Sequence, residues 1–138
     1  MKATYHKYNL EFKRPSGTSR GILTQKETWF LFVESDGKIG IGECGLLRTL
    51  SIDDRPDYEA KLKWVCNNIQ LGEAELWEAL IEFPSIQFGV EMAFQSLKSE
   101  NPFVLFPSAF TNGTKSIPIN GLVWMGEESF MKEQIEEK

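Results

Sequence analysis

The feature that most constrains the fold is a β-hairpin predicted between Thr28 and Gly45. Two runs rich in β-branched and aromatic residues flank the pair Asp36-Gly37, which accepts the positive φ angles of a type I′ turn. A two-residue turn fixes the register of the two strands. The predicted cross-strand neighbours are Trp29/Cys44, Leu31/Gly42 and Val33/Gly40 on one face, and Phe30/Glu43 and Phe32/Ile41 on the other.

Both faces of this hairpin are therefore largely apolar. An antiparallel sheet with one face in water alternates between apolar and polar residues, so we expect this hairpin to be covered on both faces. Gly40 and Gly42 lie on the same face. They leave room for large neighbours or for the close approach of another backbone.

The composition is that of a globular domain. The chain has 138 residues, of which 25% are charged and 41% hydrophobic, and its net charge is −5. This charge and the scattered basic residues argue against a nucleic-acid partner. No apolar run approaches the roughly 18 residues of a membrane span, and the first residues do not resemble a signal peptide. With only Cys44 and Cys66, the chain is expected in a reducing cytoplasm.

One more strand and two loops are predicted around the hairpin. Thr4 to Lys13 alternates between apolar and polar residues, as an edge strand does. Arg14 to Gly21 has two glycines, a proline and no periodicity, and predicts a mobile loop. Leu46 to Ile52 is apolar for a connection, so we expect its leucines to face a substrate or a further domain rather than the internal core.

Three amphipathic helices are predicted after Pro56, and Ser85 is the expected N-cap of the third. The predicted buried stripes are Tyr58, Leu62, Val65 and Ile69; Leu76, Trp77, Leu80 and Ile81; and Ile86, Val90, Ala93 and Leu97. Strands followed by helices indicate an α+β fold, with a three-stranded antiparallel meander covered by a helical block.

The last segment has a different pattern. Residues 116–126 predict a continuous apolar strand, and residues 127–138 predict the start of an amphipathic helix. A strand followed by a helix is the unit of a parallel sheet, in which each strand needs neighbours. We therefore expect two domains, residues 1–115 and 116–138, with the second the truncated beginning of a larger body.

Three sequence elements carry a resemblance to a known family. They are Gly-x-Gly-Glu at 40–43, Pro-Ser-Ile-Gln-Phe-Gly-Val-Glu at 84–91 and Ile-Pro-Ile-Asn-Gly at 117–121. Together they resemble the N-terminal part of the o-succinylbenzoate synthases of the enolase superfamily. The resemblance covers essentially the whole chain, and the Pro-Ser-x-x-Phe-Gly-Val segment is its most specific part.

The resemblance implies an enolase-superfamily N-terminal capping domain over the open end of a TIM-like barrel, followed by the first βα unit of that barrel. It implies a carbon–oxygen lyase that dehydrates a cyclohexadiene carboxylate in menaquinone synthesis, with a barrel lysine as base and Mg²⁺ held by three barrel carboxylates. Because those groups lie on later strands, no residue of this chain is expected to be catalytic or to bind metal. Dipeptide epimerases and N-succinylamino acid racemases share this cap and remain alternatives.

In that family two loops of the cap reach over a small carboxylate substrate and exclude water. By position they match residues 16–21 and 46–50. The resemblance thus gives five candidate substrate-binding residues, Thr18, Ser19, Arg20, Leu47 and Arg48. The two arginines suit a substrate carboxylate.

The remaining signals favour structural roles. Gly40-x-Gly-x-x-Gly45 matches a dinucleotide fingerprint but lies in the returning strand of a hairpin. Glu43 is expected to hydrogen-bond locally, His6 to lie at the surface, and the doublet Asp53-Asp54 to be a solvated helix start.

A stand-alone α+β binding module is the alternative from another class. In that case the apolar segment Ile117 to Met125 would join the chain's own sheet. The capping-domain hypothesis predicts instead that this segment is exposed or paired with another molecule, and self-association of the chain is then expected.

Overall fold

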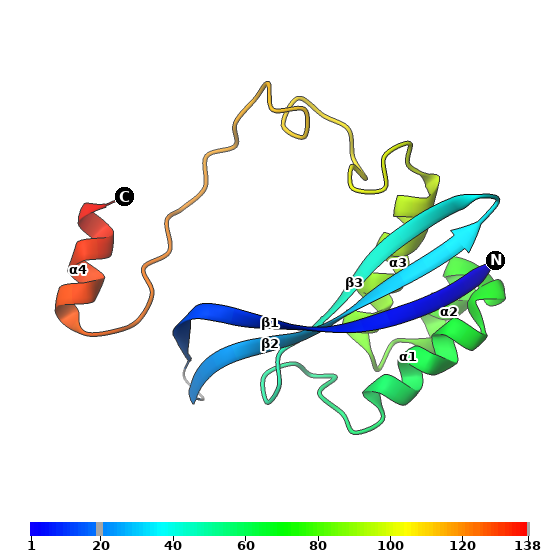
Figure 1. Cartoon of the computed structure of the whole chain (residues 1–138), viewed down its shortest axis with the longest axis horizontal. Coiled ribbons are helices and arrows are strands. Elements are labelled where there is room, and N and C mark those ends of the chain that lie inside the picture. Colours follow the sequence, from blue (N-terminus) through cyan, green and yellow to red (C-terminus); the bar gives the residue numbers. More distant parts are fainter. Residues whose placement is uncertain (19–20, 138) are drawn as a thin grey trace.

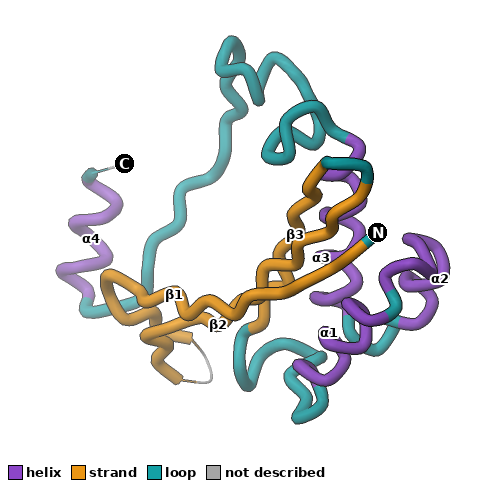
Figure 2. Tube along the Cα trace, turned by 45° about the vertical axis from the view of Figure 1, so that its right-hand side comes forward, coloured by secondary structure: helices purple, strands orange, loops and turns teal. Residues whose placement is uncertain are grey.

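The computed structural model describes residues 1–18 and 21–137. Its strands are β1 (Lys2–Thr18), β2 (Gly21–Ser35) and β3 (Lys38–Leu46), which form an antiparallel sheet in the order β1-β2-β3. Its helices are α1 (Tyr58–Asn67), the 3-10 helix η1 (Ile69–Leu71), α2 (Gly72–Ala79), α3 (Pro84–Lys98) and α4 (Glu128–Glu136). Figures 1 and 2 show α1, α2 and α3 against the sheet and α4 at the end of a long connection.

The predicted hairpin is confirmed, including its register. Trp29 pairs with Cys44, Leu31 with Gly42, and Ser35 with Lys38 across the turn. Asp36 and Gly37 have φ angles of 52° and 76°, as a type I′ turn requires. The Asp36-Gly37 turn fixes the register of β2 and β3, and this register determines which side chains of the hairpin face the helices.

The described helices cover only one face of the sheet, so the prediction of cover on both faces is wrong within residues 1–18 and 21–137. On the covered face, Trp29, Leu31 and Val33 are at most 1% exposed and join the core formed with α1, α2 and α3. On the other face, Tyr8 of β1 is 50% exposed and Phe30 is half-buried. The outer face thus remains partly apolar and accessible.

Of the two possibilities that Gly40 and Gly42 left open, the structure shows the close approach of another backbone, that of α3. A Cβ added at Gly42 would overlap the carbonyl oxygen of Gly89, and one added at Gly40 would overlap that of Ala93. The free edge of β3 is also engaged, because the Ile41 N–H donates to Ser96 Oγ at 2.9 Å. The backbone of α3 therefore lies directly on β3.

Most predicted helical stripes are buried, with two corrections. The stripes of α1 and α3 face the core, whereas Trp77 and Ile81 are 42% and 64% exposed. Trp77 lies on α2, whose buried residue is Leu76, and Ile81 lies in the turn that follows this helix. Ser85 is not an N-cap, because α3 already begins at Pro84. Proline suits that position, since a first-turn N–H has no partner inside a helix.

The described residues of the segment predicted as a mobile loop, 14–18 and 21, are β-structure, so the prediction is wrong for them. β1 continues to Thr18 and pairs with the start of β2, with a register shift between Glu11 and Ser16. Such a shift accommodates extra residues in one strand while the ladder continues beyond it. Proline at position 15 falls within the shifted stretch, where strands tolerate it.

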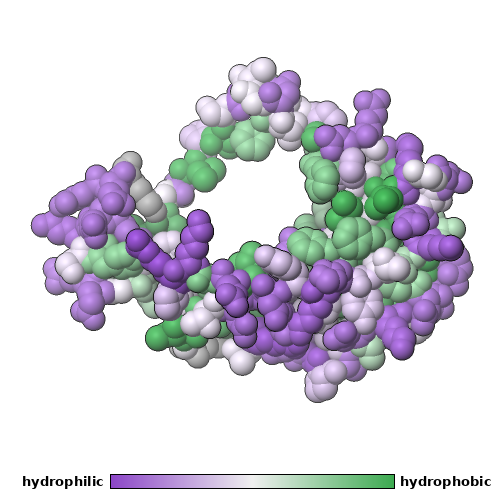
Figure 3. Space-filling view, viewed as in Figure 1, coloured by the Kyte–Doolittle hydropathy of each residue, from purple (hydrophilic) through white to green (hydrophobic). Residues whose placement is uncertain are grey.

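The strand predicted at 116–126 is absent from the structure, whereas the predicted helix is present as α4. The segment is irregular, and Ile117, Ile119 and Leu122 are 54%, 87% and 61% exposed. Apolar sequence alone cannot make a strand, because a strand needs a neighbour for its backbone hydrogen bonds. Figure 3 shows hydrophobic side chains along the connection between α3 and α4.

Replacing Gly42 with alanine is expected to destabilise the domain by about 1–3 kcal/mol, because the new methyl group must push α3 away from β3. Urea denaturation of both proteins measures this difference. The matched control is Gly45→Ala in the same strand, whose Cβ would meet the flexible end of Lys26. Equal midpoints for the two variants would contradict the close contact.

Candidate functional site

The two segments expected to cover a substrate lie at the same end of the sheet. β3 ends at Leu46, which pairs with Glu27 of β2. The first residues of β2, from Gly21 onward, therefore extend past the end of β3. Residues 22–27 of β2, together with Leu47 and Arg48, line a hollow of about 370 Å³. The structure thus brings the end of β3 beside the start of β2, and we treat this hollow as the candidate site.

Not all predicted site residues meet there. Leu47 is half-buried and Arg48 exposed, and both line the hollow. The backbone of Thr18 pairs with Gly21 at the tip of the β1–β2 hairpin. Ser19 and Arg20 lie outside the described residues. Leu46 was expected, like Leu47 and Leu50, to face a substrate or a further domain, and this is wrong: Leu46 is completely buried in the core, because it ends the inward face of β3.

Arg48 is held by two carboxylates. Its Nε pairs with Glu27, and its Nη1 donates to Asp54 Oδ1 at 2.7 Å. The guanidinium carbon also lies 5.7 Å from the centre of the Trp29 ring, within cation–π range. The charge of Arg48 is therefore already balanced inside the protein, while its second terminal nitrogen keeps N–H donors beyond these bonds.

Glu27 is shared between two cations. Lys7 of β1 pairs with it from one side and Arg48 from the other. The hydrogen bond from Lys7 and then that from Arg48 lower the pKa of the Glu27 carboxyl. The sequence offered no local signal for this cluster, because its members come from β1, β2 and the connection after β3.

The 47–55 loop, defined as the residues between β3 and the approach to α1, is internally bonded. The Leu47 carbonyl accepts the N–H groups of Leu50 and Ser51 at 3.1 and 2.9 Å. The Thr49 N–H donates to Asp54 at 2.6 Å, and this bond and Arg48 lower the pKa of the Asp54 carboxyl. The loop therefore has a defined conformation beside the hollow.

Asp53 is buried rather than solvated, so the expectation for the Asp53-Asp54 doublet is wrong. Asp53 is 1% exposed and accepts hydrogen bonds from the N–H and the hydroxyl of Ser85 at 2.9 and 2.6 Å. A buried carboxylate is tolerated because these donors replace water. Asp54, by contrast, pairs with Arg48 at the protein surface.

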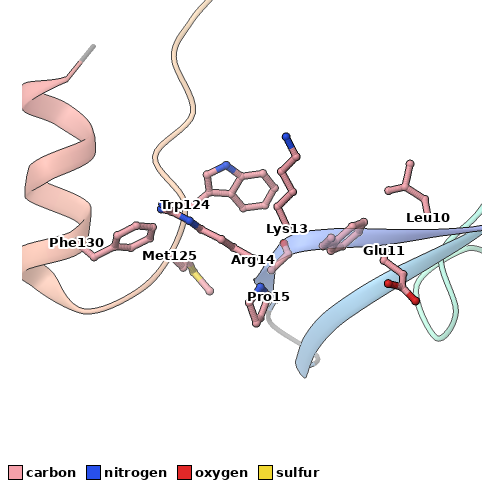
Figure 4. Close-up of a pocket in the computed structure, with 10 residues that line it drawn as sticks. Leu10, Glu11, Lys13, Arg14, Pro15, Trp124, Met125 and Phe130 are labelled. Carbon is pink, nitrogen blue, oxygen red and sulfur yellow. The ribbon is translucent and has the colours of Figure 1, made fainter.

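A second and larger hollow lies between β1 and the C-terminal segment. It measures about 660 Å³ and is lined by residues 10–16 together with Trp124, Met125 and Phe130. Figure 4 shows the side chain of Arg14 extending from β1 towards Phe130 of α4. The guanidinium carbon of Arg14 lies 5.9 Å from the centre of the Phe130 ring. Its lining is mainly apolar, so it offers packing surface rather than a constellation of chemical groups.

Comparison with known proteins identifies relatives of the chain. It is 36% identical to the o-succinylbenzoate synthase of Desulfotalea psychrophila, over all of this chain and 46% of the relative. The crystal structure of MenC from that organism matches 99% of this chain and 45% of its own, at 32% identity and a TM-score of 0.75. This chain is a relative of the o-succinylbenzoate synthases. It spans about half the length of the curated relative that it matches.

Two further solved structures share the fold of this chain. O-succinylbenzoate synthase from Thermosynechococcus elongatus, solved with Mg in its active site, matches 72% of this chain and 31% of its own at 21% identity and a TM-score of 0.61. A mandelate racemase/muconate lactonizing protein from Herpetosiphon aurantiacus matches 70% of this chain and 29% of its own at 18% identity and a TM-score of 0.53. No model of a known protein family matches the chain.

The elements that carry the resemblance to the o-succinylbenzoate synthases occupy defined places. Gly40 to Glu43 lies on β3 under α3, and residues 84–91 form the first turns of α3, including Ser85 beneath Asp53. Two of the three elements thus meet at the contact between α3 and β3. The third, at 117–121, lies in the exposed connection to α4.

The described residues do not provide a magnesium site. Among residues 1–18 and 21–137, no three acidic, histidine or cysteine side chains gather in a metal-binding arrangement. Asp53, Asp54 and Glu27 are each engaged by protein donors.

No described helix is both long and apolar enough to cross a membrane.

Glu27→Gln is expected to lower stability at neutral pH by up to about 1 kcal/mol for each exposed ion pair it weakens. Because the folded pKa of Glu27 is lowered, its contribution is present above its ordinary pKa of about 4.3 and is lost as the pH falls through the folded value. Denaturation at several pH values measures the difference. Glu34→Gln, on the exposed part of the same strand, is the control. A difference that persists unchanged at the acidic end would contradict the role of the carboxylate.

Proposed function

We propose that this chain is the capping domain of an o-succinylbenzoate synthase-like enzyme, a Mg²⁺-dependent carbon–oxygen lyase of menaquinone synthesis in the cytoplasm. The observation that carries the proposal is the match to the Desulfotalea psychrophila protein over the whole chain in both sequence and structure. The proposed division is residues 1–115 for the cap and 116–138 for the first βα unit of the barrel.

The position of the candidate site supports a covering role. Capping loops must lie together at one edge of their domain, and the tip of the β1–β2 hairpin and the 47–55 loop share one end of the sheet. In our proposal Thr18, Ser19, Arg20, Leu47 and Arg48 are the substrate-binding residues, of which Ser19 and Arg20 lie outside the described residues. Leu47 excludes water, and Arg48 offers its remaining N–H groups to a substrate carboxylate.

The chemistry belongs to the missing barrel in this proposal. When bound there, Mg²⁺ stabilises the negative charge that forms next to the substrate carboxylate. The residues of this chain bind, orient and shield the substrate but do not move its protons. A cap without its barrel is therefore expected to be inactive.

The exposed C-terminal segment supports a cap more than a stand-alone binding module. A complete module would place Ile117 to Met125 in its own sheet, but Ile119 is 87% exposed and Met125 62% exposed. In our proposal this segment docks on the rest of a barrel. Without that partner it becomes a site for self-association.

Within the superfamily the reaction itself remains a choice between related chemistries. Dipeptide epimerases and N-succinylamino acid racemases are the alternatives, because they use the same type of cap. Only barrel residues separate these reactions. The identity to an o-succinylbenzoate synthase favours the lyase.

The proposal is tested with a chimera in which residues 1–138 replace the matching part of the Desulfotalea psychrophila enzyme. We expect the chimera to form o-succinylbenzoate with Mg²⁺ and the isolated chain to form none, because only the chimera contains the catalytic groups. Product formation is the measurement, and a cooperative thermal transition shows that each protein is folded. Turnover by the isolated chain, or a folded chimera without activity, would contradict the proposal.

Arg48→Met in the chimera is expected to raise KM about tenfold or more with a smaller change in kcat, since a charged hydrogen bond to the substrate contributes about 1.5–3 kcal/mol. Steady-state kinetics measures both constants. The control is Arg55→Met in the same loop, because Arg55 pairs with Asp57 and Glu82 away from the hollow. Equal kinetic effects of the two substitutions would argue against substrate contact by Arg48.

A further inference from the structure

A single buried carboxylate fastens the 47–55 loop to the helix layer. Asp53 Oδ2 accepts both the Ser85 N–H at 2.9 Å and the Ser85 hydroxyl at 2.6 Å. Both donors belong to the first turn of α3, where backbone N–H groups have no partner within the helix. The two residues are 32 positions apart, so the contact joins the loop to an element far along the chain.

The hydrogen bonds around Ser85 have a definite direction. The single proton of the Ser85 hydroxyl is used on Asp53, so the Tyr58 hydroxyl, 2.6 Å away, donates to Ser85 Oγ. Burial raises the pKa of Tyr58, which keeps this donor protonated. The Tyr58 ring also packs 4.8 Å from Trp29 of β2. The cluster thus connects the loop to α1, α3 and the sheet.

The other end of the loop is fastened separately. Arg48 pairs with Glu27 of β2, and the Leu47 N–H donates to Ser51 Oγ at 2.9 Å. Arg48 and Glu27 are partly exposed, with 45% and 19% of their side-chain surfaces accessible, so solvent weakens their attraction. The bonds from Ser85 reach a carboxylate that is only 1% exposed, so solvent weakens them less than it weakens the pairs made by Arg48 and Arg55.

We propose that Asp53 is a positioning residue that holds the 47–55 loop beside the hollow, with Leu47 and Arg48 in its wall, before any ligand binds. The covering role of the loop rests on the proposed function, whereas the fastening concerns this chain alone. A loop that is ordered in advance loses less conformational entropy when a substrate arrives. The loop is therefore a fixed wall of the site rather than a flap that closes on binding.

Hydrogen exchange of the full chain, followed by NMR, tests this assignment. The reporters are the amides of Thr49, Leu50 and Ser51, which are hydrogen-bonded within the loop. The reference amides are those of the β2–β3 hairpin and α3. The variants are Asp53→Ala, Asp53→Asn and the control Asp57→Ala, whose carboxylate pairs with Arg55 at the surface.

We expect Asp53→Ala to accelerate exchange of the reporter amides about tenfold or more relative to the reference amides, since two charged hydrogen bonds are lost. Asp53→Asn keeps an acceptor oxygen and should give a smaller acceleration. Asp57→Ala should give none. If Asp53→Ala does not fold, Ser85→Ala must show the same local acceleration, because it removes one of the two donors.

Unchanged reporter exchange would overturn the inference, as would a common acceleration of reporter and reference amides, which would mean that Asp53 acts only on global stability. These outcomes are independent of the enzyme assay. An inactive chimera with local acceleration would remove the proposed function and leave the fastening intact. An active chimera without local acceleration of exchange would support the proposed function and overturn the fastening by Asp53.

Discussion

The direct contact between the backbones of α3 and β3 is the constraint on which the rest of the structure depends. Three glycines, at positions 40, 42 and 89, make it possible, because a Cβ at any of them would overlap atoms of the facing element. Interiors pack densely and transmit small displacements, so this contact sets the height of the helix layer above the sheet. Through the first turn of α3 it also sets the position of Ser85.

From Ser85 the same constraint reaches the candidate site. Asp53 binds the start of α3, while Arg48 binds β2 through Glu27. The loop between them is therefore located by both layers of the domain at once. The position of the loop therefore depends on the packing of the scaffold through these two anchoring groups.

The 47–55 loop is held by several polar contacts, whereas the apolar segment before α4 has few. Gln134 of α4 is the main polar link there, since its side-chain amide binds both the N–H and the carbonyl of Trp124 at 2.8 and 3.1 Å. This pairing replaces the backbone partner that a neighbouring strand would supply. These bonds hold α4 against the segment that precedes it, and neither element belongs to the main sheet.

The sequence by itself determined the hairpin, its register, the buried stripes of α1 and α3 and the free space on one face of β3 at Gly40 and Gly42. These features follow from local rules, because turn residues and side-chain periodicity act over a few positions. Only the tertiary structure decided that Asp53 is buried, that Arg48 is shared by two carboxylates and that Ile117 to Met125 is not a strand in the described chain. Each of these depends on which distant group lies opposite, and a charged side chain or an extended backbone has no fixed structure until its partner is in place.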